Sequence, residues 1–234
     1  TGADTLLGGN GLDTITGGDN NDVIDGGAGA DTINTGTNSL TITSTGAVSL
    51  AGVTSGTLAV TGNGITLNNN ITTSGTQTYT GAVTLGGSVT AASTGASSTG
   101  NAIYFSSTVN GQQALVVSAG VGLITFYDVV GGTSPLASLD TTSTHTTGVL
   151  LGGNVTTVGA QNYNSNLTLT ALNSSLTTTN SAVNVTGTVS GTLNSVTSIL
   201  QFLGGGYYVY NSSTYLVGSG SQASGFTITY NAGT

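Results

Sequence analysis

The chain has 234 residues, 39 of them glycine, and Thr, Ser, Gly and Asn together make up more than half of it. It contains no Lys, Arg, Cys, Met, Trp or Glu, and eight aspartates give a formal net charge of −8. Without cationic side chains it has no groups to neutralise phosphates or anionic lipid headgroups, so we exclude nucleic acid as a partner. No apolar run is long enough to span a membrane, and we expect no transmembrane segment.

Aliphatic residues alternate with Thr or Ser along much of the chain, as in residues 40–43 and 167–170. A period of two is typical of strands with one buried face, and no helical period persists. The sequence therefore predicts an all-β fold.

A nine-residue pattern repeats at the N-terminus, with Asp4, Asp13, Asp22 and Asp31 in equivalent positions. Each Asp precedes an aliphatic residue by two positions, and a pair of glycines follows in the first three copies. Two copies make one circuit of the coil, in which Gly-rich turns alternate with short strands. Asp4 should then stack on Asp22, and Asp13 on Asp31. Stacked carboxylates repel unless a cation lies between them, and carboxylate and carbonyl oxygens favour calcium.

This segment resembles the RTX nonapeptide repeat, the calcium-binding parallel β-roll of proteins that Gram-negative bacteria export by type I secretion. The resemblance implies calcium ligands at Asp13 and Asp31, together with turn carbonyls from residues 8–11 and 26–29. Asn20 stands where the pattern has Gly.

A second candidate site is formed by Asp4 and Asp22, but its first turn is cut off at Thr1. We therefore expect either a fragment or a coil that a neighbouring molecule completes. Asp19 and Asp25 fall outside the ligand position of the repeat and are expected to be solvated charges.

A similar circuit length continues after residue 36 without the aspartates. Leu50, Leu67 and Leu85 follow one another at offsets of 17 and 18 along the sequence, and each closes an alternating stretch. This spacing predicts that the coil continues as a β-solenoid.

Two longer sequence motifs also recur. Residues 103–111 are similar to 124–132, at an offset of 21. Residues 72–79 are similar to 156–163, at an offset of 84, which is four times 21. Rungs of about 18 to 21 residues are typical of a parallel β-helix. These phrases resemble the repeats of bacterial surface adhesins of the filamentous-haemagglutinin type, over roughly residues 39–190.

A β-sandwich array is the structural alternative. The single proline and the lack of regular hairpin signals argue against it, with two exceptions, Asn63-Gly64 and Asn110-Gly111, whose sequence favours local hairpins.

The C-terminal part is rich in aromatic side chains, and residues 199–217 carry no charge. Two interpretations stay open, a layer that caps the solenoid and a subunit interface that joins copies head to tail into a filament. The aromatic residues of this segment are Phe202, Tyr207, Tyr208, Tyr210, Tyr215, Phe226 and Tyr230.

The expected fold is therefore a parallel β-roll that continues into a β-helix or β-solenoid, with an aromatic-rich C-terminal cap or interface. We divide the chain into an RTX-type calcium-binding β-roll at 1–36, polar β-solenoid repeats at 37–198, and the cap or assembly segment at 199–234.

No arrangement of residues points to catalysis. A hydrolase needs two neighbouring carboxylates, whereas Asp128 and Asp140 are separated in the sequence and share no motif. His145 lies among threonines, as a surface histidine would. We expect a protein that is not an enzyme.

The leading hypothesis is an extracellular structural protein at a bacterial cell surface, exported by type I secretion, that forms a calcium-stabilised filament, sheath or S-layer-like assembly. Its expected partners are further copies of itself, head to tail, and a candidate cell-surface or glycan ligand. One alternative is the stalk module of a large secreted adhesin. The other is an ice-binding β-solenoid, although the Thr-x-Thr units at 14–16, 41–43, 168–170 and 227–229 are not in one regular register.

Overall fold

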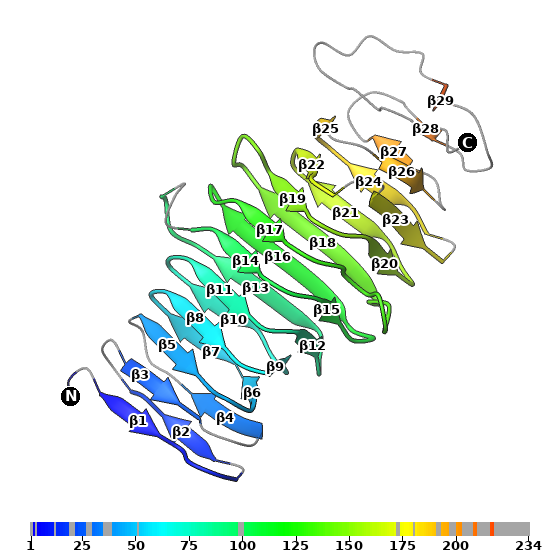
Figure 1. Ribbon diagram of the computed structural model, residues 1–234. Coiled ribbons are helices and arrows are strands. Elements are labelled where there is room, and N and C mark those ends of the chain that lie inside the picture. The colour runs from blue at the N-terminus through cyan, green and yellow to red at the C-terminus, as the bar shows by residue number, and fades with distance from the viewer. Residues whose placement is uncertain are drawn as a thin grey trace.

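The computed structural model shows an elongated all-β molecule whose short strands lie across its long axis and stack in sequence order (Figure 1). It describes residues 2, 4–11, 13–18, 22–26, 30–34, 39–50, 52–97, 101–171, 174–179 and 181–190, with only the backbone of 30–34, and the backbone of strands 193–196, 200–202, 208–209 and 216–217. These residues form no helix, and strands of successive circuits pair in parallel up to β27. The chain is a parallel β-solenoid, which confirms the expected fold class.

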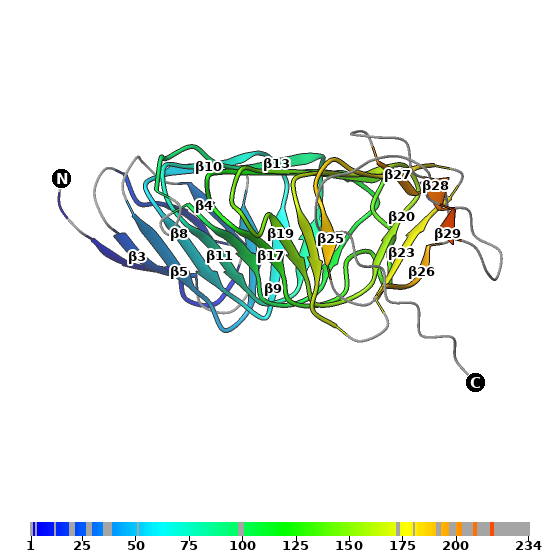
Figure 2. The ribbon, with the colours of Figure 1, turned by 90° about the horizontal axis from the view of Figure 1, so that it is seen from above.

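Three sheets run along the molecule as its faces (Figure 2). The first sheet contains β1 (Thr5–Leu7), β3 (Asp22–Asp25), β5 (Leu40–Thr43), β8 (Leu58–Thr61), β11 (Gln77–Thr80), β14 (Ile103–Phe105), β17 (Ile124–Phe126), β19 (Val149–Leu151), β22 (Leu167–Leu169) and β25 (Val189–Ser190). The second contains β7 (Val53–Ser55), β10 (Ile71–Thr73), β13 (Val89–Ser93), β16 (Ala114–Gly120), β18 (Ser138–Ser143), β21 (Gln161–Asn164), β24 (Val183–Val185), β27 (Leu200–Phe202), β28 (Tyr208–Val209) and β29 (Leu216–Val217). The third contains β2 (Thr14–Thr16), β4 (Ala30–Asn34), β6 (Ala47–Leu50), β9 (Gly64–Leu67), β12 (Val83–Leu85) and β15 (Val109–Asn110), and single bridges through Val130 connect it to β20 (Val155–Thr157), β23 (Ser174–Thr178) and β26 (Leu193–Val196).

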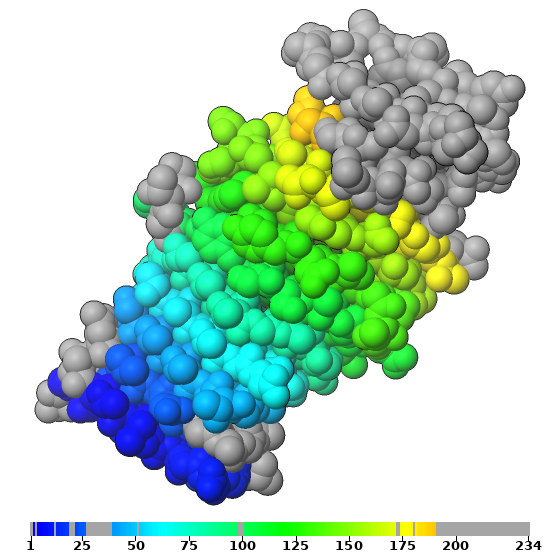
Figure 3. Space-filling view, viewed as in Figure 1, coloured from blue at the N-terminus to red at the C-terminus, as the bar shows by residue number. Residues whose placement is uncertain are grey.

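The first circuits have two strands and the later ones three. β1 to β6 alternate between the first and third sheets, as in a β-roll, and the second sheet begins with β7 at Val53. From there each circuit visits the first, third and second sheets in turn, although between β17 and β18 the third sheet is represented only by the bridge residue Val130. Strand pairing is continuous between the two parts, because β3 pairs with β5 and β4 with β6. The space-filling view accordingly shows the circuits following one another along one rod (Figure 3).

The strand register confirms most of the spacings in the sequence. Leu50 pairs with Leu67, and Leu67 with Leu85. Ile103 pairs with Ile124, which confirms the offset of 21. The expected upper limit on the circuit length was wrong, since Gln77 pairs with Ile103, an offset of 26. The difference lies between the second and the first sheet: β10 ends at Thr73 and β11 begins at Gln77, whereas β13 ends at Ser93 and β14 begins only at Ile103.

Aliphatic and aromatic side chains on the inward positions form one continuous core. Along the first sheet, Tyr79, Phe105 and Phe126 are register partners that stack face to face, with ring centroids 4.9 Å apart at both steps. Each such pair contributes about 0.5–1.5 kcal/mol beyond its burial. The parallel pairing excludes the β-sandwich alternative.

A buried polar network recurs at two corners of the solenoid. The Gln77 side chain donates to the Thr73 hydroxyl at 3.2 Å and accepts from the Tyr79 hydroxyl at 2.8 Å. Gln161 makes the same contacts with Thr157 and Tyr163, at 3.3 and 3.0 Å. All of these side chains are at most 1 % exposed, so each network satisfies polar groups inside the core.

This network corrects the interpretation of the offset of 84. Gln77 lies on β11 in the first sheet, whereas Gln161 lies on β21 in the second. The two phrases therefore turn different corners, and their offset is not a whole number of circuits. The hairpins expected at Asn63-Gly64 and Asn110-Gly111 were also wrong, because β9 and β15 pair in parallel.

The side chains of the aromatic residues expected to form a cap or an interface lie outside the described part of the chain. Of this set, Phe202 and Tyr208 belong to described strands, β27 and β28, whose pairing is antiparallel. The same arrangement continues from β28 to β29.

Candidate calcium site

The strand pairing of the repeat segment aligns its aspartates between successive circuits. Thr5 pairs with Val23, and the Val23 amide donates a hydrogen bond of 2.9 Å to the carbonyl of Asp4. Asp4 and Asp22 therefore occupy equivalent positions in successive circuits, as the spacing predicts. Thr14 pairs with Thr32 in the same way, which aligns Asp13 with Asp31 along the backbone.

Asp22 lies on the inward side of β3 and is only 3 % exposed. Its Oδ1 atom accepts a hydrogen bond of 3.0 Å from the backbone N–H of Asp4. Its Oδ2 atom lies over Gly17, where an added Cβ would approach that oxygen to 2.6 Å. The carboxylate thus folds back over its own turn and also contacts the preceding circuit.

Asp13 repeats part of this arrangement one strand earlier. An added Cβ at Gly8 would lie 2.9 Å from Oδ2 of Asp13 and 2.6 Å from the carbonyl oxygen of Gly26. Gly26 is one circuit after Gly8, so a carboxylate and a carbonyl from successive turns approach the same place. Asp13 is half-buried, and its Oδ2 atom is fully buried.

Two kinds of glycine build these turns. Gly9 and Gly18, which hold the same place in successive copies of the repeat, have φ angles of +99° and +88°, a region that other residues adopt at a cost. Gly8 and Gly17 have no positive φ but leave the space that the aspartate oxygens fill. Our sequence reasoning missed this second role. Its signal is a glycine five positions before the aspartate, as in Gly17 and Asp22.

Electrostatics favour a cation near these carboxylates. A buried ionised carboxylate is unfavourable unless it is paired or binds a metal, and this chain has no Lys or Arg to pair with it. Calcium takes roughly six to eight oxygen ligands from carboxylates and backbone carbonyls, which are the groups that these turns offer. Among the described residues, no three His, Cys, Asp or Glu side chains lie close enough together to hold a metal ion. The turn carbonyls are the further oxygen ligands that the repeat offers. The residues present therefore fit calcium.

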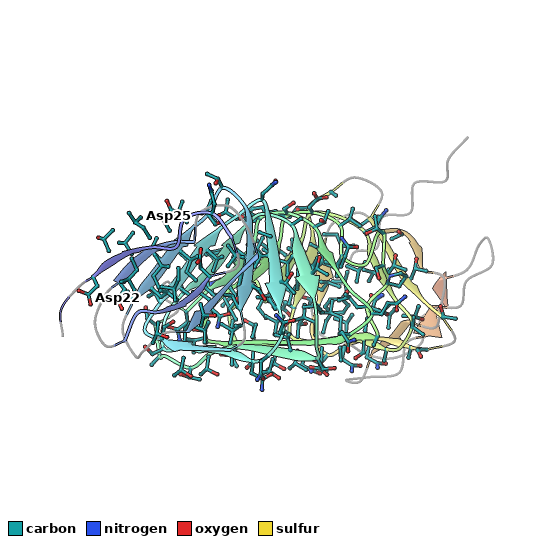
Figure 4. All side chains as sticks on the ribbon, turned by 90° about the horizontal axis from the view of Figure 1, so that it is seen from below. Asp22 and Asp25 are labelled. Atoms are coloured by element: carbon teal, nitrogen blue, oxygen red, sulfur yellow. The ribbon has the colours of Figure 1, made fainter. Side chains whose placement is uncertain are left out.

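The remaining aspartates of the N-terminal segment differ in their placement. Asp25 is half-buried at the far end of β3 from Asp22, on the outward side, and the two are labelled at the N-terminal end of the molecule in Figure 4. Asp4 is exposed. The side chain of Asp31 and the whole of Asp19 lie outside the described part, so the predictions for them stay predictions.

The other acidic groups hold local structure. Asp128 is exposed, and its Oδ1 atom accepts a hydrogen bond of 2.7 Å from the amide of Val129. The carboxylate of Asp140 on β18 accepts the side-chain amides of Asn162 and Asn164 from the next circuit, at 3.1 and 3.0 Å. His145 is half-buried, and its Nδ1 atom accepts the Thr147 amide at 3.1 Å.

Comparison with known families supports the N-terminal site. The RTX calcium-binding nonapeptide repeat matches residues 1–33 in four copies. The resemblance seen in the sequence is thus confirmed for this segment, while the filamentous-haemagglutinin resemblance of residues 39–190 is not confirmed. No curated protein and no solved structure matches the chain.

RTX repeats are typical of secreted proteins. In the part of the chain that the structure describes, no helix is long and apolar enough to cross a membrane. The chain carries calcium-binding RTX repeats at its N-terminus and continues from them into a β-solenoid, a combination that fits an extracellular structural or adhesin-like protein.

Proposed function

We propose that this chain is a calcium-stabilised structural protein of a bacterial cell surface, which assembles head to tail into a filament, sheath or lattice. Calcium would be held by Asp13 and Asp31 with the carbonyls of residues 8–11 and 26–29, and by Asp4 and Asp22 at a second site. When bound, the ion neutralises the carboxylates and joins successive turns. The observation that carries the proposal is the buried carboxylate of Asp22 in a chain without cationic side chains.

The continuity of the sheets supports a structural role for the metal. β3 and β4 belong to the repeat segment and pair directly with β5 and β6 of the polar solenoid. In a solenoid each rung is stabilised mainly by its neighbours, so ordering the first rungs stabilises those that follow. A protein that folds only where calcium is abundant is suited to export followed by folding outside the cell.

Head-to-tail assembly is supported by the composition of the C-terminal segment. Residues 199–217 carry no charge, and the segment 199–234 holds seven aromatic residues, the kind of side chain that is enriched where proteins meet. Contacts between copies that do not close produce filaments.

Electron microscopy of the protein with calcium and after chelation tests this proposal. Fibres or sheets that form with calcium and dissolve on chelation are the expected result. Dispersed short rods in both conditions would contradict assembly and favour the adhesin-stalk alternative, in which this module stays monomeric and the ligand-binding tip lies elsewhere. That alternative is favoured by the rod shape and by the sequence resemblance to filamentous-haemagglutinin repeats.

We also propose that the protein is not an enzyme. The hydrogen bonds of Asp128, Asp140 and His145 to neighbouring backbone and amide groups support a structural role for each of them. Assays with polysaccharide substrates should therefore show no release of reducing ends, and turnover abolished by Asp140→Asn would contradict this expectation.

Ice binding is a weaker candidate, although one observation favours it. Thr43, Thr61 and Thr80 are register partners on β5, β8 and β11 and form an exposed column on the first sheet. The column is short. Two circuits after Thr80, the corresponding position at the end of the strand is occupied by Tyr127. Of the four Thr-x-Thr units, 14–16 lies in the third sheet and 41–43 in the first, so those two do not share a register. We expect no thermal hysteresis, and measurable ice shaping would contradict that.

A further inference from the structure

Two tyrosines lie side by side on the outer face of the first sheet. Tyr104 is the middle residue of β14, and Tyr127 directly follows β17 of the next circuit. Their ring centroids are 6.4 Å apart and their planes are inclined by 31°. Tyr127 is 59 % exposed and Tyr104 is half-buried, so the pair presents an aromatic surface to solvent.

The core does not require this pair. Tyr79 and Tyr163 point inward, are fully buried, and hydrogen-bond to the Gln77 and Gln161 side chains. Tyr104 and Tyr127 have no such inward role, since Phe105 and Phe126 fill the core beside them.

A buried hydroxyl lies in the same patch. Thr125 pairs with Tyr104 on one side and Leu150 on the other, and it points outward because its neighbours Ile124 and Phe126 point into the core. It is nevertheless only 3 % exposed, and its Oγ1 atom has no hydrogen-bond partner. A buried polar group without a partner is unfavourable, and such local violations are expected at functional sites.

We propose that Tyr104 and Tyr127, flanked by Leu150 and Asp128, bind a neutral oligosaccharide. A pyranose ring has an apolar face of C–H groups that packs on an aromatic ring, and a rim of hydroxyls that hydrogen-bond to polar groups. The tyrosine hydroxyls and the exposed carboxylate of Asp128 offer such groups. Anionic glycans are disfavoured because the chain has a net charge of −8 and no cationic side chain. The site is independent of the calcium turns and of the proposed assembly.

Binding to insoluble cellulose, chitin and starch in calcium-containing buffer tests this site, and the wild-type protein is expected to bind at least one of them. Tyr127→Ala and Tyr104→Ala should each weaken that binding about tenfold, which corresponds to about 1.4 kcal/mol for the lost ring contact. Tyr127→Phe keeps the ring and should bind nearly as well as the wild type. Val158→Ala is the matched control, because Val158 is 54 % exposed in the turn after β20 of the third sheet, whereas the tyrosines belong to the first sheet.

Three results would overturn the proposal. They are the absence of binding to all three polysaccharides, wild-type binding by both alanine variants, and an equal loss of binding in Val158→Ala. Far-UV circular dichroism of each variant separates a lost contact from a lost fold. Raising the salt concentration should leave the affinity unchanged, because no ion pair is involved; binding that disappears with salt would contradict a neutral ligand.

Discussion

The carboxylate of Asp22 accepts a hydrogen bond of 3.0 Å from the backbone N–H of Asp4, one circuit earlier in the solenoid. This contact joins two rungs through an aspartate that is 3 % exposed and has no Lys or Arg available as a partner. It places the charge that calcium would neutralise at the contact between successive turns.

Replacing Asp22 by Asn should reduce the stabilisation of the protein by calcium. Asn keeps the shape of the side chain but removes the charge that attracts the ion. A ligand present at 100 times its Kd stabilises a fold by about 2.7 kcal/mol, which sets the scale of the expected loss. Thermal unfolding at increasing calcium concentrations measures it. Asp25→Asn, on the outward side of the same strand, is the control and should respond to calcium as the wild type does.

Replacing Gly17 by Ala should weaken calcium binding by moving the Asp22 carboxylate. The new Cβ would lie 2.6 Å from Oδ2 of Asp22, closer than real contacts allow. Gly64→Ala is the matched control, since a Cβ there would meet nothing within 4 Å and the residue has no positive φ. Calcium titration by calorimetry should show lower affinity for Gly17→Ala alone. Equal affinities in both variants would argue against Asp22 as a ligand.

Replacing Gln77 by Leu should destabilise the solenoid without affecting calcium affinity. The change removes the oxygen to which the Tyr79 hydroxyl donates and the amide that the Ala92 carbonyl accepts at 2.8 Å. The Thr73 hydroxyl loses the same amide but still donates to the Gly75 carbonyl. Each of the two groups left without a partner costs about 1–3 kcal/mol, so we expect a total of about 2 kcal/mol or more in denaturant unfolding. The exposed Gln112, changed to Leu, should alter stability by less than about 0.5 kcal/mol.

The protein should lose stability at alkaline pH. Burial raises the pKa of the Tyr79 and Tyr163 hydroxyls far above the ordinary value, because the phenolate is poorly solvated in the core. In the unfolded chain each ionises near pH 10, so the stabilisation is complete below about pH 10 and decreases as the pH rises further. The expected slope is about 1.4 kcal/mol per pH unit for each tyrosine. Unfolding free energies measured between pH 9 and 12 test this, and Tyr79→Phe should halve that contribution to the slope.

The length of the early circuits could be read from the sequence because it is set by side-chain periodicity. Leu50, Leu67 and Leu85 each end an inward-facing stretch, and a shift of one residue would turn those side chains to solvent. The change from two to three strands per circuit at Val53 could not be predicted in this way. Inward and outward side chains alternate in the same way in the strands before and after Val53. The number of strands per circuit depends instead on the positions of the turns.

The phrase shared by Gln77 and Gln161 shows why a recurring motif did not give the topology. Thr73, Gln77 and Tyr79 satisfy one another's polar groups within a single bend of the chain. The network is local and does not depend on which sheets it joins: at Gln77 it links the second sheet to the first, and at Gln161 the third to the second.

For the candidate site, the spacing of the repeat predicted the alignment of Asp4 with Asp22. It could not predict that the Asp22 carboxylate would accept the Asp4 amide, or that Gly8 and Gly17 leave room for the aspartate oxygens. Those features depend on side-chain directions in the turns, which the nine-residue period does not specify.

Hydrogen–deuterium exchange with and without calcium tests most directly whether the ion stabilises the first rungs of the solenoid. The account predicts that calcium slows amide exchange in β1, β2 and β3, with a smaller effect in β5 and none in β16, which is far along the rod. Exchange in β1 to β3 that is the same in calcium and in chelator would contradict it.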